Sequence, residues 1–121
     1  MSPLISAIIS ITLSVAAQFS LKVGVSNAEI KGLLAEPLGL RSIISIFTDK
    51  YVFFGFLLYG LGAIVWLGVI SKWDVSKAYP MVGLGFVFSV AIGFLIGEGV
   101  TPQRFFGVAL ICAGVFLVGR S

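Results

Sequence analysis

The chain has 121 residues, of which 59% are hydrophobic and only 11% are charged. A water-soluble domain carries about 25% charged residues, so this composition excludes an ordinary soluble protein and indicates a membrane protein. The net charge of +3 is too small to indicate a nucleic-acid partner, and one cysteine without any histidine excludes an internal disulfide and argues against a zinc site.

Four segments are long and apolar enough to cross a membrane. A crossing helix needs about 20 mostly apolar residues, because the hydrocarbon layer is about 30 Å thick and a helix rises about 1.5 Å per residue. Backbone polar groups in lipid must be bonded internally, so each crossing is expected to be helical. We therefore predict an all-α, multi-pass membrane protein in which residues 1–121 form a single domain. The predicted helices are residues 3–23, 51–71, 77–97 and 102–119.

The first predicted helix could be mistaken for a signal peptide. It lacks a basic leading region and a convincing small-residue cleavage site, so we expect it to be retained as the first span.

Polar side chains recur every fourth residue along this helix, at Ser6, Ser10, Ser14, Gln18 and Lys22. This spacing places them on one slowly slanting stripe. Serine is ordinary in a membrane helix, because its hydroxyl can bond the carbonyl four residues back. An amide or ammonium group that faces lipid is costly and usually faces a bundle interior or an aqueous cavity instead. The stripe therefore predicts a polar cavity wall; the alternative is that Lys22 reaches the lipid headgroups and Gln18 bonds a neighbouring helix.

The link at residues 24–50 is long and amphipathic, and Pro37 divides it. We predict a short helix that lies in the membrane interface, with a partly ordered loop as the alternative. Its apolar residues, which are interleaved with Arg41 and Ser42, are Leu38, Leu40, Ile43, Ile44 and Ile46.

The stretch WDVSKAYP precedes the third predicted helix. Ser76 is a candidate N-cap, Pro80 falls in or just after the first turn, and Trp73 and Tyr79 suit the aromatic belt of a membrane boundary. The same residues also suit a binding site, because a mobile helix that carries the Tyr79 phenol could act as a gate. Both interpretations remain open at this stage.

Small residues continue into the third predicted helix. Pro80, Gly83 and Gly85 are predicted to loosen it as a hinge. Small residues at every fourth position let another helix backbone approach closely, so they predict a packing stripe. This stripe consists of Gly85, Ser89, Gly93 and Gly97.

No nucleophile with a neighbouring base and no phosphate-binding loop occurs in the sequence, so we expect neither an enzyme nor a cofactor. The acidic residues all fall between the predicted spans, so no carboxylate is available there to carry a proton at the midplane. These residues are Glu29, Glu36, Asp49, Asp74 and Glu98.

Three stretches, SVAAQFSLK, KAYPMVGLGFVF and GEGVTPQRFFGVALICAGVFLVG, resemble the drug/metabolite transporter superfamily. Within it they are similar to the four-helix small-multidrug-resistance-like (EamA-like) branch. The pattern AAQ…K with AYPM is closest to the subunits of the flippase for aminoarabinose linked to undecaprenyl phosphate. The resemblance implies a bacterial inner-membrane transporter whose first three helices line a chamber. It also implies either an antiparallel homodimer or a heterodimer with a paralogous small subunit.

In the resembling family the fourth helix makes the contact between subunits. The resemblance places that interface at Gly107, Leu110, Ile111, Gly114 and Val115. Proton-coupled members carry a glutamate in the first helix where this chain has Ser14, whereas Lys22 matches the lysine that ends the same helix.

The implied cargo is therefore a polyisoprenyl-phosphate-linked sugar or a similar amphiphile, with Lys22 at the phosphate. The substrate-binding residues implied are Ser10, Ser14, Gln18, Lys22 and Tyr79. Two alternatives stay open: an exporter of small cationic drugs or metabolites, and a non-transporting membrane subunit of a larger complex.

Overall fold

A computed structural model describes residues 2–37 and 39–121, and its secondary structure is entirely helical over these residues. The long helices are α1 (Pro3–Val25), α4 (Lys50–Ile70), α6 (Gly83–Leu95) and α7 (Pro102–Arg120). The short ones are α2 (Ala28–Ala35), α3 (Leu40–Thr48), α5 (Val75–Ala78) and the 3-10 turn η1 (Tyr79–Val82). Together α5, η1 and α6 form one span, Val75–Leu95, so the described residues contain four candidate membrane spans, as predicted.

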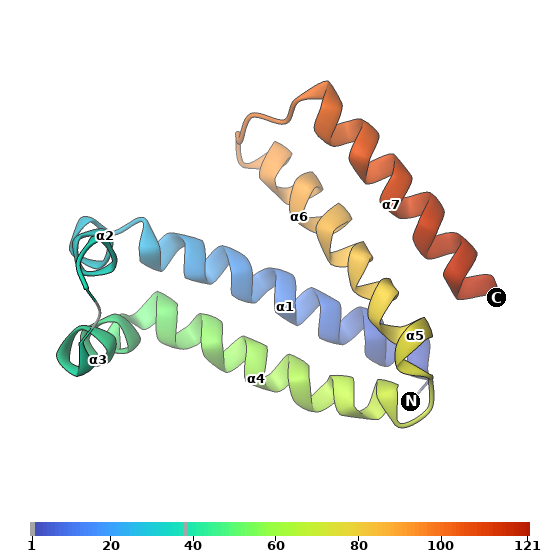
Figure 1. Cartoon of the computed structure of the whole chain (residues 1–121), viewed down its shortest axis with the longest axis horizontal. Coiled ribbons are helices and arrows are strands. Elements are labelled where there is room, and N and C mark those ends of the chain that lie inside the picture. Colours follow the sequence, from blue (N-terminus) through green and yellow to red (C-terminus); the bar gives the residue numbers. More distant parts are fainter. Residues whose placement is uncertain (1, 38) are drawn as a thin grey trace.

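The four spans form two antiparallel hairpins. In Figure 1, α4 runs back along the whole of α1, and α7 runs back beside α6. The hairpins meet where α5 joins α4 to α6, and α6 then diverges from α1 toward the link at residues 96–101 (Figure 1). Ala7, Val69 and Ala78 form the buried cluster at the closed end. The divergence leaves space between α1 and the second half of α6.

Helices α1 and α4 pack closely because glycines remove side chains from their contact. A Cβ atom added at Gly55 would lie 2.8 Å from the Leu21 side chain and 3.1 Å from the Ala17 carbonyl oxygen. Ser10 Oγ donates a hydrogen bond to the Gly62 carbonyl oxygen, at 2.7 Å. Such close packing and hydrogen bonding between helices stabilise membrane bundles, because lipid removes the usual hydrophobic advantage of burying apolar side chains.

Replacing Gly55 with Ala is expected to destabilise the α1–α4 hairpin by about 1–3 kcal/mol, because the new methyl group overpacks a contact that includes backbone. The thermal midpoint in detergent measures the effect. Gly60→Ala is the matched control in the same helix, because nothing lies within 4 Å of a Cβ atom there. Equal midpoints for the two variants would contradict the close approach at Gly55.

The link between α1 and α4 is helical rather than a partly ordered loop. It contains two short helices, α2 and α3, where one was predicted. The Asn27 side chain accepts a hydrogen bond from the Glu29 backbone N–H and so caps α2. Ile30, Ile46 and Val52 form a buried cluster that attaches both helices to α4. Leu38 lies outside the described residues, and the location of this segment in the membrane interface remains a prediction.

The third span begins earlier than predicted. Its first helical residue is Val75, so Asp74 rather than Ser76 occupies the N-cap position. The span changes to 3-10 geometry around Pro80, because proline has no N–H for the helical hydrogen-bond ladder.

The third span also ends earlier than predicted, at Leu95 instead of residue 97. Gly97 adopts a left-handed conformation with φ of 95°. The Glu98 N–H donates to the Gly93 carbonyl at 2.8 Å, and the Gly97 N–H to the Phe94 carbonyl at 3.3 Å. This pair of bonds defines a Schellman motif. Gly97 therefore terminates the helix and does not belong to the predicted packing stripe.

Candidate functional site

The polar stripe of α1 borders a cavity between α1, α4 and α6. We call this space, of about 220 Å³, the inner cavity. The structure places Ser10, Ser14 and Gln18 together on its wall. The other lining residues are Ile11, Val15, Tyr59, Trp66, Val82, Gly85, Phe86 and Ser89.

Hydrogen bonds hold the polar groups of the inner cavity in place. The Gln18 side-chain amide donates to the Tyr59 hydroxyl of α4. Ser10 is buried and bonded to the Gly62 carbonyl, and Ser89 Oγ donates to the Gly85 carbonyl at 2.8 Å. Gln18 thus contacts a neighbouring helix and also lines a cavity, which combines the two interpretations of the stripe. Its carbonyl oxygen remains available as an acceptor.

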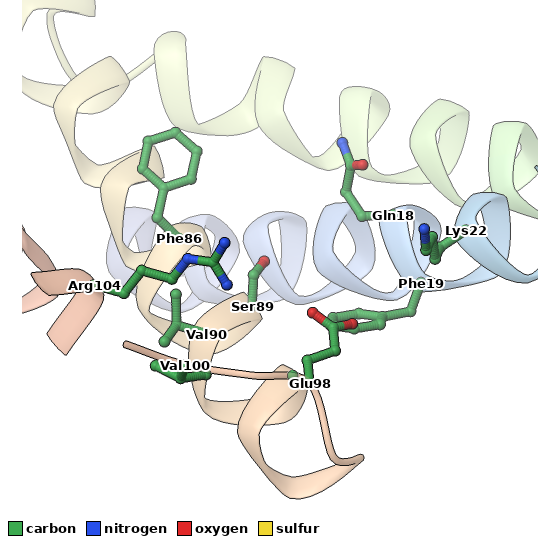
Figure 2. A pocket seen from close by; sticks show the side chains of 10 residues that line it. Gln18, Phe19, Lys22, Phe86, Ser89, Val90, Glu98, Val100 and Arg104 are labelled. Atoms are coloured by element: carbon green, nitrogen blue, oxygen red, sulfur yellow. The ribbon is translucent and has the colours of Figure 1, made fainter. Parts of the chain in front are cut away.

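A second cavity, of about 460 Å³, adjoins the first where α6 diverges from α1. We call it the mouth. It shares Gln18, Phe86 and Ser89 with the inner cavity, so the two spaces are neighbours. The remaining lining residues are Gly93 and, labelled in Figure 2, Phe19, Lys22, Val90, Glu98, Val100 and Arg104. Lys22 therefore lies at the mouth, beyond the inner cavity.

Sequence reasoning missed several polar or aromatic residues of these cavities, among them Tyr59, Trp66, Glu98 and Arg104. Tyr59 and Trp66 belong to α4, whose composition gives no polar stripe comparable to that of α1. Glu98 lies in the link at residues 96–101 and Arg104 in the first turn of α7, and the sequence pattern identifies Glu98 only as an acid outside the spans. The signal for this pair was the presence of a charged residue on each side of the short polar stretch between the last two apolar segments.

Tyr79 is not part of either cavity. Its side chain is 63% exposed and borders a separate groove of about 710 Å³ between η1 and α7. The structure therefore does not bring Tyr79 together with the other four predicted substrate-binding residues. In this groove it lies with Pro80, Gly83 and Gly114.

The glycines of the predicted hinge make close helix contacts. A Cβ atom at Gly83 would lie 3.0 Å from Ile111 Cγ2 of α7, and one at Gly85 would lie 3.3 Å from Ile11 Cγ2 of α1. Both glycines thus let α6 approach its neighbours. Movement about Pro80 remains a prediction.

The predicted interface residues of α7 divide into two sets. Val115 is buried and packs with Ile111 against Gly83 in the same chain. Gly107, Leu110 and Gly114 lie on a face that nothing covers: Leu110 is 60% exposed, and no atom lies within 4 Å of a Cβ atom added at either glycine. We call these three residues the outer face of α7.

Comparison with known proteins identifies relatives over about half to two thirds of the chain. No family model matches the chain, and no solved structure matches it. The chain is 39% identical over 80 residues to a probable 4-amino-4-deoxy-L-arabinose-phosphoundecaprenol flippase subunit ArnE of Pseudomonas savastanoi pv. phaseolicola. This alignment covers 65% of this chain and 70% of the relative.

Two further relatives carry the same description. The protein of Pseudomonas aeruginosa is 42% identical over 66 residues, which is 54% of this chain and 57% of the relative. The protein of Serratia proteamaculans is 38% identical over 72 residues, which is 59% of this chain and 63% of the relative. These two alignments span less than two thirds of the relatives' own length.

Proposed function

Since the chain belongs to the ArnE family of flippase subunits, we propose that it carries a polyisoprenyl-phosphate-linked amino sugar from one leaflet of the bacterial inner membrane to the other. The chain is a small-multidrug-resistance-type membrane transporter subunit, not an enzyme. The relatives are named for 4-amino-4-deoxy-L-arabinose-phosphoundecaprenol, and we take this lipid as the model cargo. Its headgroup carries sugar hydroxyls, an amine and a phosphate, and its polyprenyl tail is soluble in the bilayer.

The observation that carries this proposal is the inner cavity with its uncharged polar wall. Ser14, Gln18 and Tyr59 offer hydroxyl and amide groups that can exchange hydrogen bonds with sugar hydroxyls. Trp66 adds an aromatic surface. A pocket that combines apolar walls with a few placed polar groups is typical of a small-molecule site. The adjoining mouth provides a path from the membrane surface, and the tail can stay in lipid.

The absence of acidic residues from the spans favours this cargo over a cationic drug. None of the candidate spans, as the structure describes them, contains Asp or Glu. A lipophilic cation in a low-dielectric chamber needs an opposite charge, because an unpaired buried charge is costly. Ser14 offers only a hydroxyl group. The inner cavity is therefore better suited to a headgroup whose ammonium group is balanced by its own phosphate than to a permanent cation without a counter-charge.

We further propose that the outer face of α7 binds the second subunit, either an antiparallel copy or a paralogous chain. The relatives are described as subunits, and α7 is the least buried span of the chain. Gly107 and Gly114 would let a partner helix approach closely, and Leu110 would pack between them.

The proposal is tested by reconstituting the full chain into liposomes, alone and with a paralogous small subunit. The lipid-linked amino sugar is added to the outer leaflet, and an amine-reactive reagent that cannot cross the membrane labels the amount that remains outside. We expect this amount to fall with time, well beyond the fall in protein-free liposomes. An unchanged amount under both conditions, together with saturable binding of a quaternary ammonium compound, would instead support the drug exporter.

A further inference from the structure

We propose that the mouth recognises the cargo headgroup as a zwitterion: Glu98 binds the ammonium group of the amino sugar, and Lys22 and Arg104 bind the phosphate. This inference rests on the proposed function and adds the residues that select an amine-bearing headgroup. It concerns the mouth alone and does not depend on the hydrogen-bonding wall of the inner cavity.

Three separate elements bring these charges to one cavity. Lys22 lies in the last turn of α1, Glu98 in the link after α6, and Arg104 in the first turn of α7. In Figure 2 the Glu98 carboxylate extends from the α6–α7 link toward α1, on which Lys22 lies. All three residues lie at the end of the bundle where the hairpins diverge, which is the level at which a lipid headgroup would enter.

The local backbone fixes the position of the Glu98 carboxylate. The Schellman motif at Gly97 turns the chain back over the end of α6, and the Glu98 N–H bonds to the Gly93 carbonyl. A Cβ atom at Gly93 would lie 3.0 Å from Glu98 Oε1, so the carboxylate rests against a position where glycine leaves room. The Arg104 guanidinium donates to the Gly99 carbonyl at 2.8 Å, which ties α7 to the same link.

These charges do not neutralise one another. Across residues 2–37 and 39–121, no ion pair within 4.0 Å involves Lys22, Glu98 or Arg104. The Glu98 carboxylate and the Lys22 ammonium group are therefore free to pair with a ligand. Arg104 uses one guanidinium nitrogen for the link and keeps further N–H groups, which suit the oxygens of a phosphate.

The presence of the carboxylate points to a zwitterion rather than to any anionic lipid. Lys22 and Arg104 alone would be explained by long side chains reaching toward phospholipid headgroups. A carboxylate beside them is not explained in this way, because it is repelled by anionic lipids. It weakens the attraction of the mouth for lipids that carry only phosphate and favours a headgroup that also carries a cation. An amino sugar attached to a phosphate has both charges.

The test measures binding of two lipids to the purified full-length chain with its partner subunit in detergent. One is the lipid-linked amino sugar, and the other is the same lipid with the amine acetylated and therefore uncharged. The wild type is expected to bind the amine-bearing lipid about tenfold or more tightly, because hydrogen bonds to charged groups are the stronger ones. Equal affinities in the wild type overturn the inference without any variant.

Glu98→Gln is expected to remove this preference. It should weaken binding of the amine-bearing lipid about tenfold and leave the affinity for the acetylated lipid unchanged. Glu98→Asp should retain most of the preference for the amine-bearing lipid. Arg104→Gln should weaken binding of both lipids by a similar factor. Glu29→Gln, on α2 and outside both cavities, is the matched control. Size-exclusion profiles and thermal midpoints check that each variant folds.

The outcomes separate the two proposals. If the wild type transports and binds the lipid but Glu98→Gln keeps its full preference for the amine, the role of Glu98 is wrong and the proposed function stands. If the wild type neither binds nor moves either lipid, the proposed function fails and the inference fails with it.

Discussion

Replacing Gln18 with Leu is expected to slow transport of the lipid-linked amino sugar strongly while leaving the chain folded. Gln18 is the one residue of the α1 stripe that lines both the inner cavity and the mouth, so a moving headgroup must pass it. Leucine is similar in size but offers no hydrogen bond. A sugar hydroxyl left without a partner in the cavity costs about 1–3 kcal/mol, which corresponds to a fall in rate of about 5- to 150-fold.

The liposome assay measures this rate, and two further variants show whether a fall in rate comes from the loss of the Gln18 amide. Thr12→Val removes a hydroxyl from α1 that bonds only the Ile8 carbonyl and lies outside both cavities, so transport should be unchanged. Tyr59→Phe removes the partner of Gln18 but leaves its amide in the cavity, so transport should fall only partly. If Gln18→Leu transports normally, cargo does not pass along the α1 stripe. If Tyr59→Phe is equally inactive, Gln18 acts by holding α1 against α4.

Replacing Gly114 with Leu is expected to prevent assembly with the second subunit and, with it, transport. Gly114 lies on the outer face of α7, where an added Cβ atom has no described atom of its own chain within 4 Å and a larger side chain would keep a partner helix at a distance. The variant chain should therefore remain folded and lose only its partner. Co-purification of differently tagged subunits measures the loss, and an intact thermal midpoint of the single chain shows that folding is unaffected.

Ala109→Leu is the matched control for this variant. Ala109 is exposed in the same helix but, five residues before Gly114, lies on another side of it. It should co-purify and transport like the wild type. If Gly114→Leu assembles normally, α7 does not form the subunit contact through its outer face, and another exposed surface must do so.

The polar stripe of α1 could be predicted from the sequence, whereas the location of Tyr79 could not. A spacing of four residues fixes a stripe on a helix regardless of what surrounds it, so Ser10, Ser14 and Gln18 were found on one wall. The resemblance implies that Tyr79 binds substrate with them, but the structure places Tyr79, in the 3-10 turn at Pro80, at the groove beside α7. How one helix lies against another does not follow from the sequence pattern of either helix alone.

The same distinction explains the third span. Hydropathy predicted its existence, but its ends depend on individual hydrogen bonds. Asp74 rather than Ser76 begins it, and Gly97 ends it in a left-handed conformation that only the closing bonds of the Schellman motif reveal. Glycine is compatible with both a packing stripe and a helix end, so sequence spacing could not choose between the two.

By itself, the sequence determined that this chain crosses a membrane four times as helices and that a polar edge runs along the first of them. Lipid forces backbone groups to bond locally, so length and hydropathy suffice for these properties. Only the tertiary structure decided that α6 diverges from α1 and that Glu98 and Arg104 line the resulting mouth together with Lys22. It also decided that the Gln18 amide donates a hydrogen bond to the Tyr59 hydroxyl. Those outcomes bring residues 82 positions apart, Lys22 and Arg104, to the wall of one cavity, because of how the helices pack.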